Sequence, residues 1–377
     1  MKISSTAVAL SVFLAINIAI PVSLCLKKDK GAGDTIQRAL MGASERLQIS
    51  AGKAKPVVLI GSSLIIAPLW SADVKHGFFH QDCMNHHESK QLKNILSAAG
   101  MSADVVSLAT AGQFVSDTYL IVDKLLTEET KPEVLVYGIA PRDFMDDTAG
   151  GMALTSVFDQ LVTFSDMPTV SQLFFNTYEE RIDFMLNRTN YIYRKRGRYQ
   201  TKFQESCEKL AAGLMRDKKA QIATIAGAND PLAGFLVGGN RTEIWTKSIE
   251  EYRQRYKSFN EQQFNKQKLC FKALVDLCQK RQIKLCVVAM PLTEDNRKLM
   301  PGSMYDQYIS FVETTSKQSS VPFIDLDKSG AYQNADFYDT VHLNGDGGDR
   351  FISTVGNLVT RESSSSLAGS KPAVKAY

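Results

Sequence analysis

The sequence lacks closely spaced cysteines. Its six cysteines are scattered over 377 residues, at Cys25, Cys83, Cys207, Cys270, Cys278 and Cys286. No CxxC pair and no dense framework of cysteines is present, so neither a zinc ribbon nor a disulfide-stapled scaffold is indicated. We expect most of these cysteines to be buried thiols.

An excess of charge of one sign is also lacking. The chain has 44 basic and 40 acidic residues, which gives a net charge of +4. A surplus this small does not indicate a nucleic-acid partner, and we expect none. No internal repeat is visible. With 44% hydrophobic and 22% charged residues, the chain has enough apolar material to form a core.

One long uncharged run stands near the N-terminus. Residues 7–26 read AVALSVFLAINIAIPVSLCL, about the length that crosses a bilayer. The run is long for an export signal and has no obvious cleavage site, so residues 1–30 are expected to hold a membrane anchor. A cleaved export signal and a hydrophobic soluble helix are the alternatives. Lysines on both sides of the run leave its orientation open.

Short apolar runs alternate with segments of helical periodicity. The apolar runs cover residues 57–60, 105–108, 134–137, 285–289 and 322–324. The helical segments include residues 89–99, 114–126, 305–316 and 348–359. This alternation predicts an α/β fold, a three-layer α/β/α sandwich around a mainly parallel, flavodoxin-like sheet of five strands. In such a sheet the active site lies beyond the carboxyl ends of the strands.

The alternation is interrupted once. Residues 150–245 are expected to form a mainly helical insertion or cap, which would separate a first part of the α/β domain (31–149) from a second part (246–361). Residues 249–281 have a strongly helical, charge-rich pattern. A basic and aromatic cluster at residues 191–199 is suited to anionic lipid or polymer, or is a solvated helix face. Residues 362–377 lack apolar periodicity, which predicts a disordered tail.

Two segments far apart in the chain carry hydroxyl, imidazole and carboxylate groups. Ser62 and Ser63 follow the first strand, where serine is either a nucleophile that needs a nearby base or an ordinary turn and N-cap residue. Asp339 and His342 stand three residues apart before the last helix. An aspartate at this offset can fix the imidazole tautomer and leave the other ring nitrogen to accept a serine proton.

The order of these motifs resembles the SGNH, or GDSL-type, hydrolase superfamily. The matching segments are GSSL at 61–64, LATAG at 108–112, YGIAPRDF at 137–144 and DTVH at 339–342. The resemblance implies that Ser63 is the nucleophile, His342 the base and Asp339 its orienting partner. It also implies that the backbone amides of Ser63 and Gly112 line an oxyanion hole. The family needs no cofactor and no metal, and we expect neither.

The chain departs from the family pattern at two positions. Ser62 stands where members commonly carry aspartate. Arg142 precedes Asp143 in the third motif, where members usually supply an asparagine that donates to the oxyanion. Arg142 either replaces that donor through its guanidinium or pairs with Asp143, Asp146 or Asp147 to brace the loop.

The resemblance implies a serine esterase or O-acyltransferase that acts on ester-linked acyl groups through an acyl-enzyme. Segments 138–147 and 290–301 resemble a membrane-anchored bacterial branch associated with acyl transfer onto cell-envelope polymers. The expected partners are an acyl-ester small molecule or an envelope polymer, with the chain anchored at the extracytoplasmic face of the membrane. The alternative is a weakly active or inactive anchored binding or assembly protein on the same fold.

A cluster of histidines is the remaining candidate site. His76, His80, Cys83, His86 and His87 lie close together in the sequence. The step from His76 to His80 is compatible with two ligands on one helix face, but the glycine and phenylalanines between them favour a loop packed against the core. No third ligand is clearly placed, so we expect no metal here.

Overall fold

The computed structural model describes residues 35–78, 82–146, 148, 151–175, 177–189 and 240–369. The predicted anchor at 7–26 and the cluster at 191–199 lie outside these residues. Within the described part, no helix combines the length and the apolar character needed to span a bilayer. The chain divides into two compact units, and the described residues 163–175 and 177–189 belong to the smaller one.

The larger unit is built on a sheet of five parallel strands. These are β1 (Val57–Gly61), β2 (Val105–Ser107), β3 (Val134–Ile139), β4 (Leu285–Ala289) and β5 (Phe323–Asp325). Their order is β2-β1-β3-β4-β5, and every pair is parallel. Strands β1 to β4 are buried throughout, which explains why they consist almost entirely of apolar residues. The predicted flavodoxin-like sheet is confirmed.

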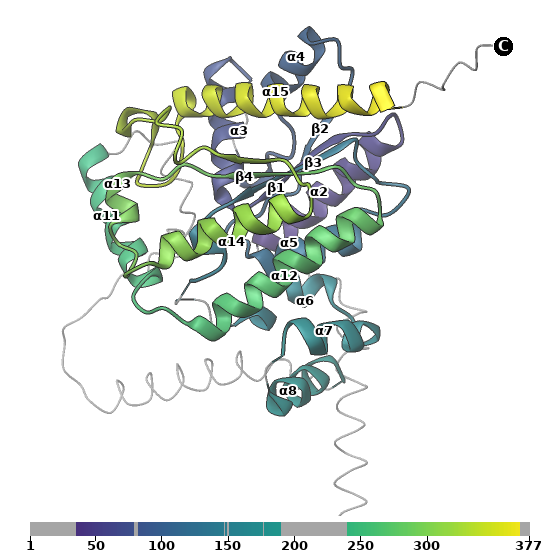
Figure 1. The fold of residues 1–377 in the computed structure, drawn as a ribbon, viewed down its shortest axis with the longest axis vertical. Coiled ribbons are helices and arrows are strands. Elements are labelled where there is room, and N and C mark those ends of the chain that lie inside the picture. Colours follow the sequence, from purple (N-terminus) through teal and green to yellow (C-terminus); the bar gives the residue numbers. More distant parts are fainter. Residues whose placement is uncertain are drawn as a thin grey trace, which may run out of the picture. The chain divides into compact units, whose positions relative to one another are not determined.

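Helices form two groups that cover the sheet (Figure 1). One group comprises α3 (Ser63–Lys75), α4 (Lys90–Ala98) and α15 (Gly345–Gly369), which pack on one another. The other comprises α5 (Val115–Leu125), α12 (Glu261–Lys280) and α14 (Met304–Gln318). Buried residues of α12 recur every three or four positions, from Phe264 to Cys278, as expected for a helix with one face on the core. The predicted three-layer sandwich is confirmed.

The remaining elements are shorter or peripheral. In the larger unit they are α2 (Thr35–Ala51), η1 (Cys83–Asn85), η2 (Pro141–Asp143), η3 (Met152–Leu154), α6 (Ser156–Leu161), α11 (Arg241–Arg255), α13 (Glu294–Arg297) and η6 (Asn334–Asp336). The smaller unit contains η4 (Phe164–Asp166), α7 (Met167–Leu173) and α8 (Tyr178–Thr189).

Two expected boundaries differ in the structure. The helical pattern at 249–281 belongs to two helices, because α11 ends at Arg255 and α12 starts anew at Glu261. The side chain of Asn260 caps α12 by accepting a hydrogen bond from the Gln263 amide at 3.0 Å. The prediction of a disordered tail at 362–377 is wrong for residues 362–369, because α15 continues to Gly369. Its final residues, 370–377, lie outside the described part.

The division into units also differs from the expected insertion at 150–245. The chain passes from the larger unit to the smaller one after Val162 and returns at Asp230. Helix α6 therefore belongs to the α/β unit, where it contacts α5 and α2. One link is the hydroxyl of Thr155, which donates to the Asp117 carboxylate at 2.6 Å. Helix α11 belongs to the same unit.

The four cysteines in the described part are buried and free of disulfides. Burial raises the pKa of Cys270, Cys278 and Cys286 to about 12. These side chains therefore behave as small apolar groups, as predicted. Cys25 and Cys207 lie outside the described residues.

Candidate active site

The sheet order places the end of β1 at a topological switch point. From β1 the chain goes to β2 on one side and then to β3 on the other, so the carboxyl ends of β1 and β3 flank a natural binding crevice. Gly61 ends β1 with a φ of +150°, and a Cβ there would lie 2.5 Å from the Gly138 carbonyl oxygen. Only glycine fits this position. Ser62 follows as a buried N-cap residue, and Ser63 opens α3.

Ser63 and His342 meet although 279 positions separate them in the chain. The Ser63 Oγ lies 2.9 Å from the His342 Nε2, within hydrogen-bond distance. Their meeting follows from the packing of α15 on α3, because His342 lies three residues before the start of α15 and Ser63 opens α3. A Cβ at Gly348 would lie 2.6 Å from the Pro68 carbonyl oxygen, so a glycine permits this close approach.

Asp339 holds the other side of the imidazole. Its Oδ2 lies 2.7 Å from the His342 Nδ1, and its Oδ1 accepts from the amides of Val341 and His342, both at 2.8 Å. Burial disfavours the Asp339 carboxylate, but the charge of His342 and these hydrogen bonds outweigh burial and lower its pKa. An ionised Asp339 therefore fixes the ring orientation and leaves Nε2 toward Ser63.

The segment carrying Asp339 and His342 is a tight loop. Phe337 and Leu343 form an isolated antiparallel bridge at its base. Above the bridge, the Tyr338 amide donates to the His342 carbonyl oxygen at 2.8 Å. The two catalytic candidates are thus fixed relative to each other by backbone bonds as well as by the carboxylate.

The amides predicted to form an oxyanion hole lie at the same edge of the sheet. Ser63 is the first residue of α3, where a backbone N–H has no acceptor within the helix. Gly112 follows β2 in a left-handed turn, with φ of +73°. That turn is tied to the end of β1 by the Thr110 amide, which donates to the Gly61 carbonyl oxygen at 3.1 Å.

Arg142 is buried and holds the Gly112 turn. Its Nη2 donates to the Gly112 carbonyl oxygen at 2.8 Å, and its Nη1 to the Gln113 carbonyl oxygen at 3.3 Å. The Nε donates to Asp146 at 3.2 Å, and the Asp143 carboxylate is 3.5 Å from Nη1. The guanidinium carbon also lies 5.0 Å from the centre of the Phe114 ring. These contacts are the ones expected if Arg142 braces its loop.

The pKa values of the carboxylates around Arg142 shift in opposite directions. Burial raises the pKa of Asp143 to about 7, against the opposing charge of Arg142 and a hydrogen bond from the Ala140 amide. Burial also acts on Asp146, but the charges of Arg142 and Arg255 outweigh it and lower the pKa. Asp146 is therefore the ionised partner of Arg142. Asp147, the remaining predicted partner, lies outside the described residues.

The histidine cluster does not converge on one point. His76 Nε2 lies 2.9 Å from Asp349 at the surface, whereas His86 Nε2 lies 3.1 Å from the buried Asp73. The ring of His87 packs near Gly42 on α2. Across the described residues, no three His, Cys, Asp or Glu side chains are arranged to hold a metal ion. His80 is not among those residues.

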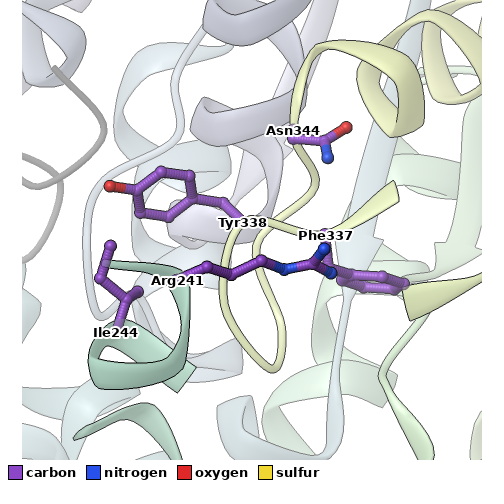
Figure 2. Close-up of a pocket in the computed structure, with 5 residues that line it drawn as sticks. All are labelled: Arg241, Ile244, Phe337, Tyr338 and Asn344. Atoms are coloured by element: carbon purple, nitrogen blue, oxygen red, sulfur yellow. The ribbon is translucent and has the colours of Figure 1, made fainter. Parts of the chain in front are cut away.

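A pocket borders the loop that carries Asp339. It encloses about 190 Å³ and is lined by Arg241, Ile244, Phe337, Tyr338 and Asn344. Figure 2 shows the Arg241 side chain reaching toward the Phe337 ring, while Tyr338 points away from that ring. Sequence reasoning did not single out these residues. The sequence feature that could have indicated this pocket is the pair of aromatic residues immediately before Asp339.

Comparison with known proteins gives a family and distant structural similarities, including one to an esterase. The crystal structure of an acetyl xylan esterase, AlAXEase, matches with a TM-score of 0.38 and 13% identity, over 81% of this chain and 99% of that chain. The curated proteins contain no match. Residues 91–352 match the family model described as "Protein of unknown function (DUF1574)". Because that match covers more than half of the chain, the chain belongs to this family.

Proposed function

We propose that this protein is a serine esterase or O-acyltransferase that acts on ester-linked acyl groups. The observation that carries the proposal is a series of three groups, each within hydrogen-bond distance of the next. Ser63 Oγ is 2.9 Å from His342 Nε2, and His342 Nδ1 is 2.7 Å from Asp339. A serine hydroxyl becomes a useful nucleophile when a base lies within hydrogen-bond distance and is itself oriented by a third group.

The proposed reaction has two halves. Ser63 Oγ attacks the ester carbonyl carbon while its proton moves to His342 Nε2, and Asp339 stabilises the resulting imidazolium. Collapse of the tetrahedral intermediate breaks the bond to the leaving alcohol, which takes the proton from His342. Water or an acceptor hydroxyl then attacks the acyl-enzyme, again losing its proton to His342, and Ser63 is released with a proton.

Backbone amides of Ser63 and Gly112 are the proposed donors to the oxyanion. In this account Arg142 acts through the turn, because its guanidinium binds the carbonyl oxygens of Gly112 and Gln113. Arg142 stands at the sequence position of the usual asparagine, but in this account its side chain does not donate to the oxyanion. Preorganised donors of this kind are typically worth about 100-fold or more in rate each.

The natural substrate is proposed from the resemblance alone. Segments 138–147 and 290–301 resemble an envelope-associated bacterial branch, which favours an envelope polymer over a free small ester. Residues 7–26 have the length and composition to anchor the chain to the membrane that such a polymer lies on.

Labelling with a fluorophosphonate tests the nucleophile. The full-length wild-type protein should be labelled, and Ser63→Ala should abolish labelling because the phosphonylated oxygen is removed. Ser62→Ala is the matched control, since it deletes the adjacent hydroxyl and leaves the Ser63–His342 contact in place. Labelling that persists in Ser63→Ala and disappears in Ser62→Ala would contradict the proposal, because Ser62 would then be the nucleophile.

A second candidate function is an anchored binding or assembly protein that holds an acyl ester without turning it over. The engagement of Arg142 with loop carbonyls and Asp146 favours it, because the chain then lacks the side-chain donor of the third motif. Hydrolysis of p-nitrophenyl acetate distinguishes the two. An esterase predicts a large loss of rate in His342→Ala, whereas equal rates in wild type and His342→Ala would favour the binding protein.

A further inference from the structure

Thr340 lies between Asp339 and His342 and is fully buried, with 0% of its surface exposed. Its hydroxyl is 2.5 Å from the Ser248 hydroxyl on α11 and accepts from the Asn296 side-chain amide at 3.2 Å. A threonine hydroxyl in a surface loop usually hydrogen-bonds water. Here two side chains from outside the loop hold it.

The backbone of Thr340 is held by the same neighbours. Its amide donates to the Ser248 hydroxyl at 3.3 Å. Its carbonyl oxygen accepts from the Thr293 hydroxyl at 2.8 Å and from the Thr293 amide at 3.2 Å. Thr293 in turn caps α13, where its hydroxyl also accepts from the Asn296 amide at 3.3 Å. Every polar group of Thr340 is thus bonded to α11 or to the start of α13.

Helix α11 reaches both loops of the candidate site. Ser248 contacts Thr340, and Arg255, seven residues and two turns further along the same helix face, pairs with Asp146 in the loop braced by Arg142. Only Ser248 and Tyr252 of this helix are buried. The helix is therefore held to the site largely by polar contacts, which depend on direction more than apolar packing does.

We propose that Thr340 is a positioning residue, held by Ser248, Thr293 and Asn296, that sets the distance between His342 and Ser63. The inference rests on the proposed function and deepens it. Asp339 and His342 lie on either side of Thr340, and Asp339 also accepts from the amides of Val341 and His342, so a shift of Thr340 disturbs the bond between Asp339 and the imidazole as well as the distance from the imidazole to Ser63. A shift of Thr340 is consequently passed to the imidazole, and a misplacement of about 1 Å can cost on the order of 100-fold in rate.

Three variants separate positioning from simple stability. Thr340→Val keeps the shape and removes the hydroxyl, whereas Thr340→Ser keeps the hydroxyl. Thr246→Val is the matched control, because it removes a hydroxyl from α11 that bonds only within the helix, to the Thr242 carbonyl oxygen at 2.8 Å. Each full-length protein is compared by its rate of fluorophosphonate labelling and by kcat and KM for p-nitrophenyl acetate, well below its own unfolding midpoint.

We expect Thr340→Val to lower the labelling rate and kcat by about tenfold or more, with KM little changed, since the ester is bound but the base is misplaced. Thr340→Ser should stay within about threefold of wild type, as should Thr246→Val. Equal rates for Thr340→Val and wild type would overturn the proposal. A Thr340→Ser variant as slow as Thr340→Val would also overturn it, because the hydroxyl would then not be the group that matters.

A spectroscopic readout keeps this test separate from that of the proposed function. The short Asp339–His342 bond should give a downfield proton resonance for the imidazole N–H. Positioning predicts that this resonance is lost or broadened in Thr340→Val and kept in Thr340→Ser and Thr246→Val. A wild-type protein that is not labelled would refute the esterase. An unchanged resonance in Thr340→Val would refute the positioning role in either case.

Discussion

At the scale of single residues, two buried aspartates show how hydrogen-bond donors decide ionisation. Asp339 beside His342 and Asp73 at the end of α3 both have lowered pKa values. Burial raises the pKa of each, but several donors offset it. Asp73 accepts from His86, from the Ser89 hydroxyl and from the amides of Lys90 and Gln91 at 2.8–3.1 Å. It therefore links α3 to the start of α4.

The substitution Asp73→Asn tests this link. An amide has the size of the carboxylate but offers a single acceptor oxygen and no charge, so buried donors lose their partner. We expect a loss of about 3 kcal/mol in the free energy of unfolding at pH 7, measured by urea denaturation. Asp346→Asn, which removes an exposed partner of Lys75, should change little.

The difference in unfolding free energy between wild type and Asp73→Asn should depend on pH, and the direction of that dependence follows from the pKa of Asp73. Because the pKa of Asp73 is lower in the folded protein, its contribution is fully present above the ordinary carboxyl pKa of roughly 4. The contribution is lost as the pH falls through the lowered value. The gap in stability between wild type and Asp73→Asn should therefore narrow at acid pH. A gap independent of pH between 7 and 3 would contradict an ionised Asp73.

The sequence predicted the candidate triad but not the residues that hold it. Ser63, His342 and Asp339 could be found because the motifs that carry them follow the order of a known family, and because the chain has only five histidines, one of which stands three residues after an aspartate. For Arg142 two roles stayed open, since a guanidinium after a strand can point to a ligand or to its own loop. Thr340 and Ser248 gave no signal, because a single hydroxyl becomes informative only when its partner is known.

At the scale of elements, the approach of α15 to α3 brings the two halves of the site together. Gly348 lies against the Pro68 carbonyl oxygen, and a Cβ there would be 2.6 Å from this backbone atom and 3.0 Å from the Ser71 hydroxyl. A backbone atom cannot move aside as a flexible side chain can. The spacing between these helices is therefore set by the absence of a side chain.

Gly348→Ala should push the helices apart. We expect a loss of about 1–3 kcal/mol in the free energy of unfolding from overpacking, together with slower fluorophosphonate labelling because His342 moves from Ser63. Gly52→Ala is the control, since a Cβ there meets only ordinary contacts at 3.5 Å or more. Wild-type stability and labelling in Gly348→Ala would show that the contact does not set the helix spacing.

Strands were easier to predict than helix ends. Each strand of a sheet covered on both faces is a short apolar run, and such runs are visible in the sequence without knowledge of the partners. The break between α11 and α12 was missed because charged residues continue the helical pattern across it. It depends on the cap formed by Asn260, a residue that also occurs inside helices. The continuation of α15 to Gly369 was missed because serines dominate its last turns.

At the scale of the whole molecule, the fold class followed from the alternation of strands and helices, and the strand order placed the candidate nucleophile. The reversal of order at β1 puts Ser63 where flavodoxin-like sheets bind their ligands. The division of the chain into units at Val162 and Asp230 was not visible, since it depends on contacts between distant segments. Anchoring by residues 7–26 stays a prediction, because those residues lie outside the described part.

The account as a whole depends on a covalent intermediate at one oxygen atom. The most direct measurement is mass-spectrometric mapping of the acyl group in full-length protein that has reacted with p-nitrophenyl acetate and been quenched in acid. We predict one acetyl group in the peptide that contains both serines, with fragment ions that assign it to Ser63 and not to Ser62. Acetylation of Ser62, or of no serine in this peptide while ester is consumed by the folded protein, would contradict the account.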